Sequence, residues 1–275
     1  MSVLTKIDNR YVYVVMIIIT LYPLIYPMGL PIPINDDVRA VYDGIEAIPE
    51  GSLVIMDWNT RFGRPTRMIL MEDLFRHLMT RNMKIVHVSF DKALEGGEVA
   101  QRIIQQVDPE ANYGYEYGVD YVNLGSVGGS TSALQGFVAD PWSIFPVDQR
   151  NRPIDDMPIM QLLKTGTDID AIVFAGTSHL MWIGQLTQQH PIPLFGACDA
   201  GEATEVIPYV ESGQIVGILN DMRGGAEYEV LTGVPGDAIK TTDPLNTIQL
   251  TQAALLVITN IIYFASKGKG KEGGV

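Results

Sequence analysis

Six short apolar runs recur along residues 35–244, and they constrain the fold more than any other feature of the sequence. Each run is continuously apolar or nearly so, whereas a half-exposed strand alternates apolar with polar residues. Runs of this kind are typical of strands that are covered on both faces, as in a parallel sheet. The predicted strands are Leu53–Trp58, Lys84–Phe90, Asp120–Gly125, Ala171–Gly176, Ile192–Ala197 and Gln214–Asn220.

Helical segments separate most of these runs, and we expect them at Pro65–Arg81, Gly97–Val107, Ser132–Phe137, Ser178–Gln189 and Glu202–Ser212. Strands that alternate with helices predict an α/β fold with a Rossmann-like, doubly wound, mostly parallel sheet. The run FGACDAGEATEVIPYVESGQIVGIL, residues 195–219, resembles the late strand–helix–strand unit of periplasmic-binding-protein-like sensor domains. This resemblance implies the same fold class.

The stretch Ala139–Gly166 interrupts the alternation with four prolines and two aromatic residues, Trp142 and Phe145. We expect a long excursion with one short helix at Met157–Lys164. Long loops in compact domains often serve as lids or interaction surfaces. A segment that only wraps around the core is an equally good interpretation.

An uncharged apolar stretch at the N-terminus, Tyr11–Asn35, is the first of two candidate membrane anchors. About 20 apolar residues span the hydrocarbon core of a bilayer, which predicts a transmembrane helix at residues 11–30. Its tyrosines flank the stretch as interfacial aromatic residues do. A cleaved signal peptide is the alternative, but no alanine precedes Ala40 to form the usual cleavage site.

The second candidate anchor is the uncharged stretch Leu245–Ser266 near the C-terminus. It is long enough to span a bilayer, and a basic tail follows it, although five polar residues lie within it. Polar residues within a span usually face another helix, so residues 245–266 could also contact other membrane proteins. The alternative is an amphipathic helix that packs on the domain.

Positive charge at both ends predicts the topology. Lysine and arginine residues lie in the tails 1–10 and 267–275, whereas the flanks on the domain side are mixed or acidic. The positive-inside rule therefore places both tails in the cytoplasm and the domain, residues 35–244, outside the cell membrane. The lipid bilayer is then the first expected partner.

The composition of the domain excludes several classes of function. The chain carries a formal charge of −13, and residues 35–244 carry 14 Lys/Arg against 30 Asp/Glu. Such a domain repels phosphate backbones, so we expect no nucleic-acid partner. Cys198 is the only cysteine, which excludes an intramolecular disulfide and a cysteine-based zinc site. We expect neither a cofactor nor a metal.

Small and polar residues follow every predicted strand, and ligands of open α/β sheets bind at these carboxyl ends. They make the candidate ligand site. Its members are Asp57, Asp91, Ser126, Gly128, Gly129, Ser130, Thr131, Thr177, Ser178, His179, Asp199, Asp221 and Arg223. Asp57, Asp91, Asp199 and Asp221 could together hold a divalent cation, but caps and turns explain them at least as well.

The segment GSVGGSTS, residues 125–132, is the strongest local feature of this set. A Gly/Ser loop that leads into a helix can present backbone N–H groups to an anion. However, the segment lacks the lysine of a Walker A motif and the spacing of a dinucleotide fingerprint. The alternative is a tight turn whose helix is capped by Ser130 or Thr131.

Two further candidates have a simpler structural interpretation. Ser178 and His179 are adjacent, so they do not face each other as a catalytic dyad would, and Ser178 is better read as a helix N-cap. Arg223 could pair with a ligand carboxylate, but a neighbouring carboxylate of the protein is the more common partner.

No complete catalytic signature is present, which favours a non-enzymatic function. The first hypothesis is a membrane-anchored domain that binds a small ligand or a partner protein, within or outside a larger membrane complex. The alternative is a membrane-tethered hydrolase or transferase that uses Ser and Asp residues at the strand ends. A purely structural subunit is the third hypothesis.

Overall fold

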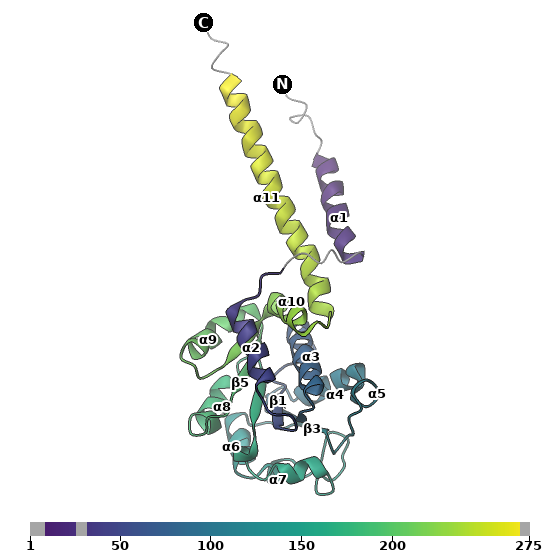
Figure 1. Cartoon of the computed structure of the whole chain (residues 1–275), viewed down its shortest axis with the longest axis vertical. Helices are drawn as coiled ribbons and strands as arrows, with labels where there is room; N and C mark the ends of the chain where they lie inside the picture. Colours follow the sequence, from purple (N-terminus) through teal and green to yellow (C-terminus); the bar gives the residue numbers. More distant parts are fainter. Residues whose placement is uncertain (1–8, 26–31, 270–275) are drawn as a thin grey trace. The chain divides into compact units, whose positions relative to one another are not determined.

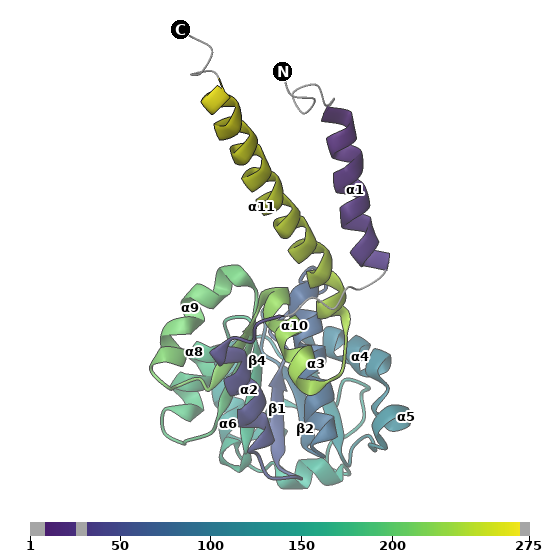
Figure 2. The same ribbon diagram turned by 45° about the horizontal axis from the view of Figure 1, so that its top comes forward.

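The computed structural model describes residues 9–25 and 32–269. The chain forms two compact units, of which one is Ile32–Ala238 and the other consists of the terminal segments Met1–Pro31 and Ile239–Val275. The first unit is the α/β domain, whose sheet and surrounding helices are visible in Figures 1 and 2.

Six strands of the described residues form one parallel sheet, in the order β3-β2-β1-β4-β5-β6. The prediction of an α/β fold with a parallel sheet is therefore confirmed. Every predicted strand is present, with ends that differ by at most three residues. The strands are β1 (Leu53–Asp57), β2 (Lys84–Ser89), β3 (Tyr121–Ser126), β4 (Ala171–Ala175), β5 (Leu194–Cys198) and β6 (Gly217–Asn220).

Helices cover both faces of the sheet, so the domain has two hydrophobic cores. Alternate residues of β1 point into different cores: Val54 and Met56 into one, Leu53 and Ile55 into the other. The first core is closed by α2 (Asp36–Glu46), α3 (Pro65–Thr80), α4 (Gly96–Val107), α5 (Pro109–Tyr113) and α10 (Asp221–Thr232). The second is closed by α6 (Thr131–Ala139), α7 (Pro141–Ile144), η2 (Pro158–Leu162), α8 (His179–Trp182), η4 (Ile183–Thr187) and α9 (Ala200–Glu211).

The excursion Ala139–Gly166 contributes to the second core. Phe145, Ile154 and Ile159 are buried in it, and the short helices α7 and η2 lie within this stretch. The structure therefore favours the wrapping interpretation over a lid. The predicted helix Met157–Lys164 is a short 3₁₀ helix, η2.

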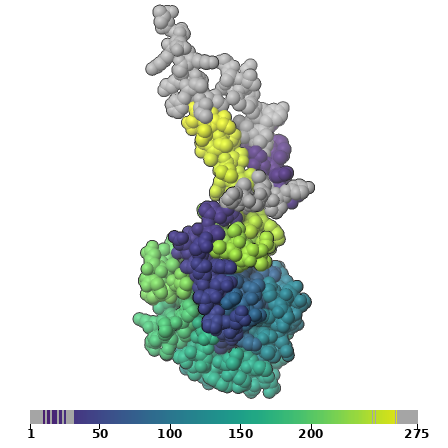
Figure 3. All heavy atoms as spheres, viewed as in Figure 1, coloured from purple at the N-terminus to yellow at the C-terminus, as the bar shows by residue number. Residues whose placement is uncertain are grey.

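Two helices that the sequence did not predict, α2 and α10, pack against each other beside β6 (Figure 3). Both ends of the domain are bound to α10 through backbone amides. Asn35 N donates to Glu227 Oε2 at 2.8 Å, and Ala238 N donates to Glu229 Oε1 at 2.8 Å. The chain therefore enters and leaves the domain at the same helix.

The second unit contains α1 (Asn9–Ile25) and most of α11 (Asp237–Lys269). Within residues 9–25 and 32–269, no helix has both the length and the apolar character needed to cross a membrane. The structure thus does not support the two transmembrane helices predicted at 11–30 and 245–266. Residues 1–8, 26–31 and 270–275, which include parts of the first predicted span and of both predicted tails, lie outside the described residues.

Candidate functional site

The strand order fixes where a ligand crevice can form. The chain runs from β1 outward through β2 to β3, and then returns to the other side of β1 to form β4. At such a switch point, the loops after the two central strands leave in opposite directions and open a crevice at their carboxyl ends. In this domain the switch point lies between the ends of β1 and β4, with the end of β5 next to it.

Several of the predicted site residues meet at this edge. Asp57 ends β1, Thr177 and Ser178 follow β4, and Asp199 follows β5. Asp91 comes after β2, on the other side of β1. The loop after β3 is farther away, because three strand spacings of about 4.8 Å separate β3 from β4. The sheet therefore brings together the candidates after β1, β4 and β5, and it leaves the Gly/Ser loop to one side.

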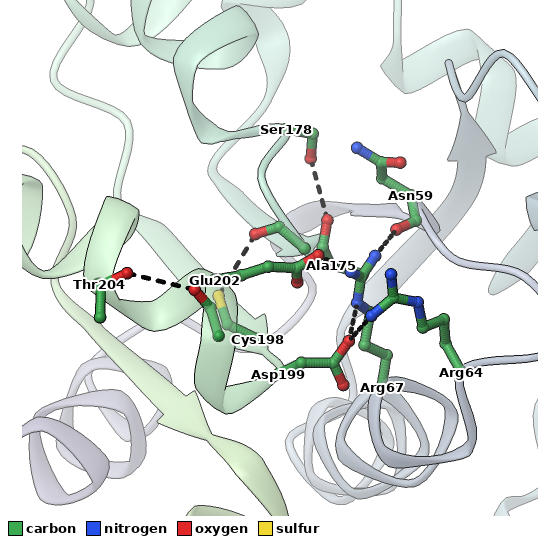
Figure 4. Close-up of polar contacts among 11 residues, drawn as sticks. Asn59, Arg64, Arg67, Ala175, Ser178, Cys198, Asp199, Glu202 and Thr204 are labelled. Carbon is green, nitrogen blue, oxygen red and sulfur yellow. Dashed lines mark hydrogen bonds and ion pairs between the residues drawn. The ribbon is translucent and has the colours of Figure 1, made fainter.

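A charged group from outside the predicted set, Arg67 of α3, lies at the centre of this edge (Figure 4). Its side chain is only 8% exposed. Nη1 donates to the backbone oxygen of Asn59 at 2.8 Å, Nε donates to Asp199 Oδ2 at 3.0 Å, and Nη2 pairs with Glu202 Oε1. The guanidinium thus joins the loop after β1 to the loop and helix after β5.

Arg64, one turn earlier, shares the same acceptor. Its Nη1 donates to Asp199 Oδ2 at 2.9 Å, and its side chain is 47% exposed. We call Arg64, Arg67, Asp199 and Glu202 the edge cluster. The cluster contains two cations and two anions, so its charges balance. Burial lowers the pKa of Arg67, while the neighbouring Asp199 raises it.

Gly176, directly after β4, makes room for Arg67. Its φ is +70°, and a Cβ atom at this position would lie 2.5 Å from Arg67 Nη1. Any other residue would therefore meet both a strained backbone and a collision with the guanidinium. The loop after β4 thus also determines the position of Arg67, because Gly176 leaves space for its guanidinium.

Asp57 lies beneath this edge, on the side of the second core, and is fully buried. Its Oδ2 accepts a hydrogen bond from Trp182 Nε1 at 2.8 Å, while Oδ1 is buried without a hydrogen bond of normal geometry. Burial raises the pKa of Asp57 to about 6, although Trp182, the Ser178 hydroxyl and the Phe90 amide act to lower it. This carboxyl group can therefore exchange a proton near neutral pH.

Ser178 and His179 do not form a catalytic pair. Ser178 occupies the predicted N-cap position of α8, but its hydroxyl donates to the backbone oxygen of Ala175 at 3.4 Å and makes no cap bond. His179 is fully buried between Phe174 and Tyr209, and neither ring nitrogen has a hydrogen-bond partner. Burial lowers its pKa, which keeps the ring neutral at physiological pH.

The Gly/Ser loop after β3 has a different structure from the one expected. Gly128 and Gly129 are exposed, and Gly129 has a φ of +113°. Ser130 also has a positive φ, and its side chain makes no cap bond to α6, whose first residue is Thr131. The predicted cap at this turn is therefore absent. Ser126 Oγ instead accepts the Gly97 N–H at 2.7 Å.

Asp221 and Arg223 belong to α10 and not to a loop. Asp221 is the first residue of this helix and has a φ of +60°. Arg223 Nε donates to Glu227 Oε1 at 3.0 Å, as expected for an arginine with a carboxylate partner within the protein. Among the described residues, no three His, Cys, Asp or Glu side chains are grouped as metal ligands. The proposed cluster of Asp57, Asp91, Asp199 and Asp221 is thus not formed.

A second group of titratable side chains lies beneath α10. His77 Nδ1 is 2.6 Å from the Tyr228 hydroxyl, and His77 Nε2 is 2.9 Å from Glu46 Oε1. Asp73 and Glu229 both approach Gly236, where a Cβ atom would lie 3.3 Å from Asp73 Oδ1 and 2.5 Å from Glu229 Oε1. We call Glu46, Asp73, His77, Tyr228 and Glu229 the α10 cluster.

Glu46, Asp73 and His77 of the α10 cluster line a small cavity of about 90 Å³. Burial, together with the carboxylates of Glu229 and Glu72 and against Arg76, raises the pKa of Asp73 to about 9. Asp73 is therefore protonated at neutral pH. The cavity is lined by Tyr42, Glu46, Asp73, Arg76, His77, Thr80, Thr232 and Val234.

Sequence reasoning missed Arg67, although a signal for it was present. Arg61, Arg64 and Arg67 follow β1 at a spacing of three residues, in a domain where cations are few. On a helix this spacing places Arg64 and Arg67 on one face. The spacing did not indicate which carboxylates would meet them, because Asp199 and Glu202 lie more than 130 residues later in the chain.

Comparison with known proteins returned no match: no family model, no curated protein and no solved structure matches the chain.

Proposed function

We propose that the domain Ile32–Ala238 is a non-enzymatic receptor that binds a small ligand at the crevice between the ends of β1 and β4. The observation that carries the proposal is the buried guanidinium of Arg67 at this switch point, with partners from the loops after β1 and β5. A buried charge is costly unless a function or a complete set of partners retains it. Polar groups at the switch point are where open α/β sheets bind their ligands.

The side chains around the crevice support binding over catalysis. The Ser178 hydroxyl donates to the backbone oxygen of Ala175, and the adjacent His179 makes no hydrogen bond through either ring nitrogen, so the two do not form a nucleophile–base pair. His179 is neutral, buried and surrounded by aromatic rings. The loop after β1 also contains a single glycine, Gly63, which does not resemble the glycine-rich loop of dinucleotide-binding folds.

Hydrogen exchange can test the proposal. Small molecules released by denaturing the purified full-length protein are identified by mass spectrometry, and each is added back to ligand-free protein. We expect slower amide exchange in residues 57–67, 176–182 and 198–205, which surround the crevice. Protection confined to other segments contradicts the proposal. Arg39→Met removes an exposed arginine of α2 and serves as the matched control for Arg67→Met, which should abolish the protection.

A membrane-tethered hydrolase or transferase is the alternative, and one observation favours it. The pKa of Asp57 is raised to about 6, which suits a general base near neutral pH, and the Ser178 hydroxyl lies close enough to affect it. Because Asp57 is fully buried, a substrate would reach it only after α8 moved. Turnover of an ester or phosphoester substrate that is lost in both Asp57→Asn and Ser178→Ala would establish this alternative and refute the receptor.

We also propose that the terminal helices attach the domain to a cell membrane, with the domain on the outer side. Exposed apolar side chains on both helices support this, among them Ile17 and Ile18 of α1 and Leu256 and Val257 of α11. Polar residues of α11, such as Asn260, would then face another membrane protein. Alkaline carbonate should leave the protein, and a variant without residues 1–35, in the membrane pellet; release of both contradicts the anchor.

A further inference from the structure

We propose that the ligand of this crevice carries an oxyanion, a carboxylate or a phosphate, that binds Arg64 and Arg67 in place of Asp199 and Glu202. In the structure described here, these two acidic side chains act as internal substitutes for the ligand. This inference rests on the proposed receptor function and specifies the chemical class of its ligand.

The two arginines already form an oxyanion site. A single oxygen atom, Asp199 Oδ2, accepts hydrogen bonds from Arg64 Nη1 at 2.9 Å and from Arg67 Nε at 3.0 Å. Charged donors that converge on one carboxylate oxygen are the arrangement by which proteins bind carboxylate and phosphate groups. A ligand oxyanion of similar size can make the same contacts.

Arg67 would keep its position without the acidic residues. Nη1 is held by the backbone oxygen of Asn59 at 2.8 Å, and the absent side chain at Gly176 leaves the space that the guanidinium fills. Neither contact involves Asp199 or Glu202. The binding group is therefore preorganised, which lowers the entropy lost when a ligand binds.

The side chains of Asp199 and Glu202 have an alternative set of hydrogen-bond donors at the start of α9. Asp199 is the N-cap residue of this 12-residue helix, and its backbone has the extended conformation of a capping residue (φ −70°, ψ 153°). Glu202 is the third residue of the helix, so the pair has the spacing of a capping box. In a capping box the N-cap side chain accepts the backbone N–H of the third helical residue, and the side chain of that residue accepts the backbone N–H of the N-cap.

Neither side chain makes this cap in the structure. The Asp199 carboxylate makes no cap hydrogen bond and contacts Arg64 and Arg67, and Glu202 contacts Arg67. The second Glu202 oxygen, Oε2, is buried without a hydrogen-bond partner. When a ligand oxyanion displaces the two carboxylates, they can form the capping box, so the loss of their ion pairs is partly offset. Binding thus exchanges the ion pairs of the two carboxylates for hydrogen bonds to the helix start.

Two conservative substitutions test the exchange. Asn is a good N-cap residue and Gln can form a capping box, so Asp199→Asn and Glu202→Gln keep the helix start while removing both negative charges. Affinity for inorganic phosphate, and separately for succinate, is measured by isothermal titration calorimetry on the full-length protein at low salt. We expect the double variant to bind at least one probe about tenfold more tightly than the wild type, because the competing charges are gone.

A charge-matched control separates this effect from the net charge of the domain. Glu211→Gln removes an exposed acidic residue at the far end of the same helix and should leave both affinities unchanged. Adding Arg64→Met to the double variant removes the half-exposed arginine without disturbing the core, and it should reverse the gain. The probe that gains more identifies the ligand as a phosphate or as a carboxylate.

Either of two results would overturn the proposal: no gain for phosphate or succinate in the double variant, or a gain that persists after Arg64→Met. A neutral or cationic ligand that protects residues 57–67 and 198–205 would also overturn it while leaving the receptor function intact. Protection elsewhere would refute the receptor function itself, so the two failures are distinguishable.

Discussion

The edge cluster and the α10 cluster each include residues of α3, Arg67 in one and Asp73 and His77 in the other, and they balance their charges in different ways. In the edge cluster, two arginines face two carboxylates, and Asp199 Oδ2 contacts both guanidiniums. Every charge there has a partner of opposite sign. The cluster is thus stable as long as all of its members remain.

In the α10 cluster, Arg81 Nε lies 3.7 Å from Glu46 Oε2, whereas Asp73 is balanced in another way. Glu229 is 1% exposed and lies close to Asp73, and His77 stays neutral because burial lowers its pKa. Arg76 is committed to Glu72 at 2.7 Å. A proton on Asp73 therefore takes the role that an arginine has at the edge. From this difference we expect anions and salt to change the stability that the edge cluster contributes, whereas pH should change the contribution of the α10 cluster.

The largest effect is expected from breaking the edge cluster at its centre. Arg67→Met leaves two partly buried carboxylates and the Asn59 backbone oxygen without their donor, which should lower the free energy of unfolding by about 3 kcal/mol. Urea denaturation followed by tryptophan fluorescence measures this, since all three tryptophans lie in the domain. A loss no larger than that of the exposed-surface variant Arg39→Met would show that the ion pairs contribute little.

In the α10 cluster, by contrast, removing a charge is expected to raise the free energy of unfolding. Asp73 binds a proton more tightly in the folded state, where its pKa is about 9, than in the unfolded state, where it is near 3.8. Its presence therefore lowers stability progressively as the pH rises from about 4 to about 9. Asp73→Asn should raise the free energy of unfolding at pH 7 by about 2 kcal/mol, a value reduced from the full shift because the residue is partly exposed.

Denaturation curves at pH 5, 7 and 8.5 check this prediction. The gain from Asp73→Asn should grow with pH, because the cost of ionising Asp73 in the folded state grows in the same direction. A gain that is equal at all three pH values would mean that Asp73 is ionised in the folded protein. The comparison between a cation-balanced and a proton-balanced cluster would then fail.

A smaller loss is expected where the α10 cluster relies on neutral hydrogen bonds. Tyr228→Phe removes the hydroxyl that lies 2.6 Å from His77 Nδ1 in a fully buried position. It should lower the free energy of unfolding by about 1 kcal/mol. Because neither partner is charged, the loss should be the same at low and at high salt. A loss that shrinks in 1 M NaCl would indicate a charged His77.

The smallest effect is expected at the exposed side of the edge cluster. Arg64→Met removes an ion pair whose arginine is 47% exposed, so it should lower the free energy of unfolding by only about 0.5 kcal/mol. Salt screens exposed charges, and the difference from the wild type should vanish near 1 M NaCl, as thermal melts at two salt concentrations can show. A loss comparable to that of Arg67→Met would mean that the two arginines act as one unit.

The strands of this fold were predictable, because their apolar runs are local and continuous. Lys84–Phe90 and Ala171–Gly176, for example, match β2 and β4 to within one residue. The helix α10 was not predicted, since Gly224 and Gly225 near its start indicate a turn. Its helical structure depends on packing: a Cβ atom on Gly225 would lie 2.6 Å from Leu70 Cδ2. Local propensity could not reveal this close contact.

The candidate site was predictable only in part, for a related reason. The rule that ligands bind at the carboxyl ends of strands led to Asp57 and Asp199, but the sequence made the loop after β3 the strongest candidate. Strand order decides between these loops, and it depends on contacts between strands that are distant in sequence. Glu202 and Arg67 were missed because each has its role only when the starts of α3 and α9, from opposite faces of the sheet, meet at its carboxyl edge.

The two carboxylates of α10 that bind the ends of the domain have a mechanical consequence. Glu227 holds the amide of Asn35, and Glu229, two residues later, holds the amide of Ala238. Tension between the two ends would be carried from one amide to the other through a single turn of α10, without passing through the strands. The sheet and the crevice at its edge would bear no force until the hydrogen bonds of Glu227 and Glu229 to the two amides broke. A domain held by both ends could thus be pulled without being unfolded.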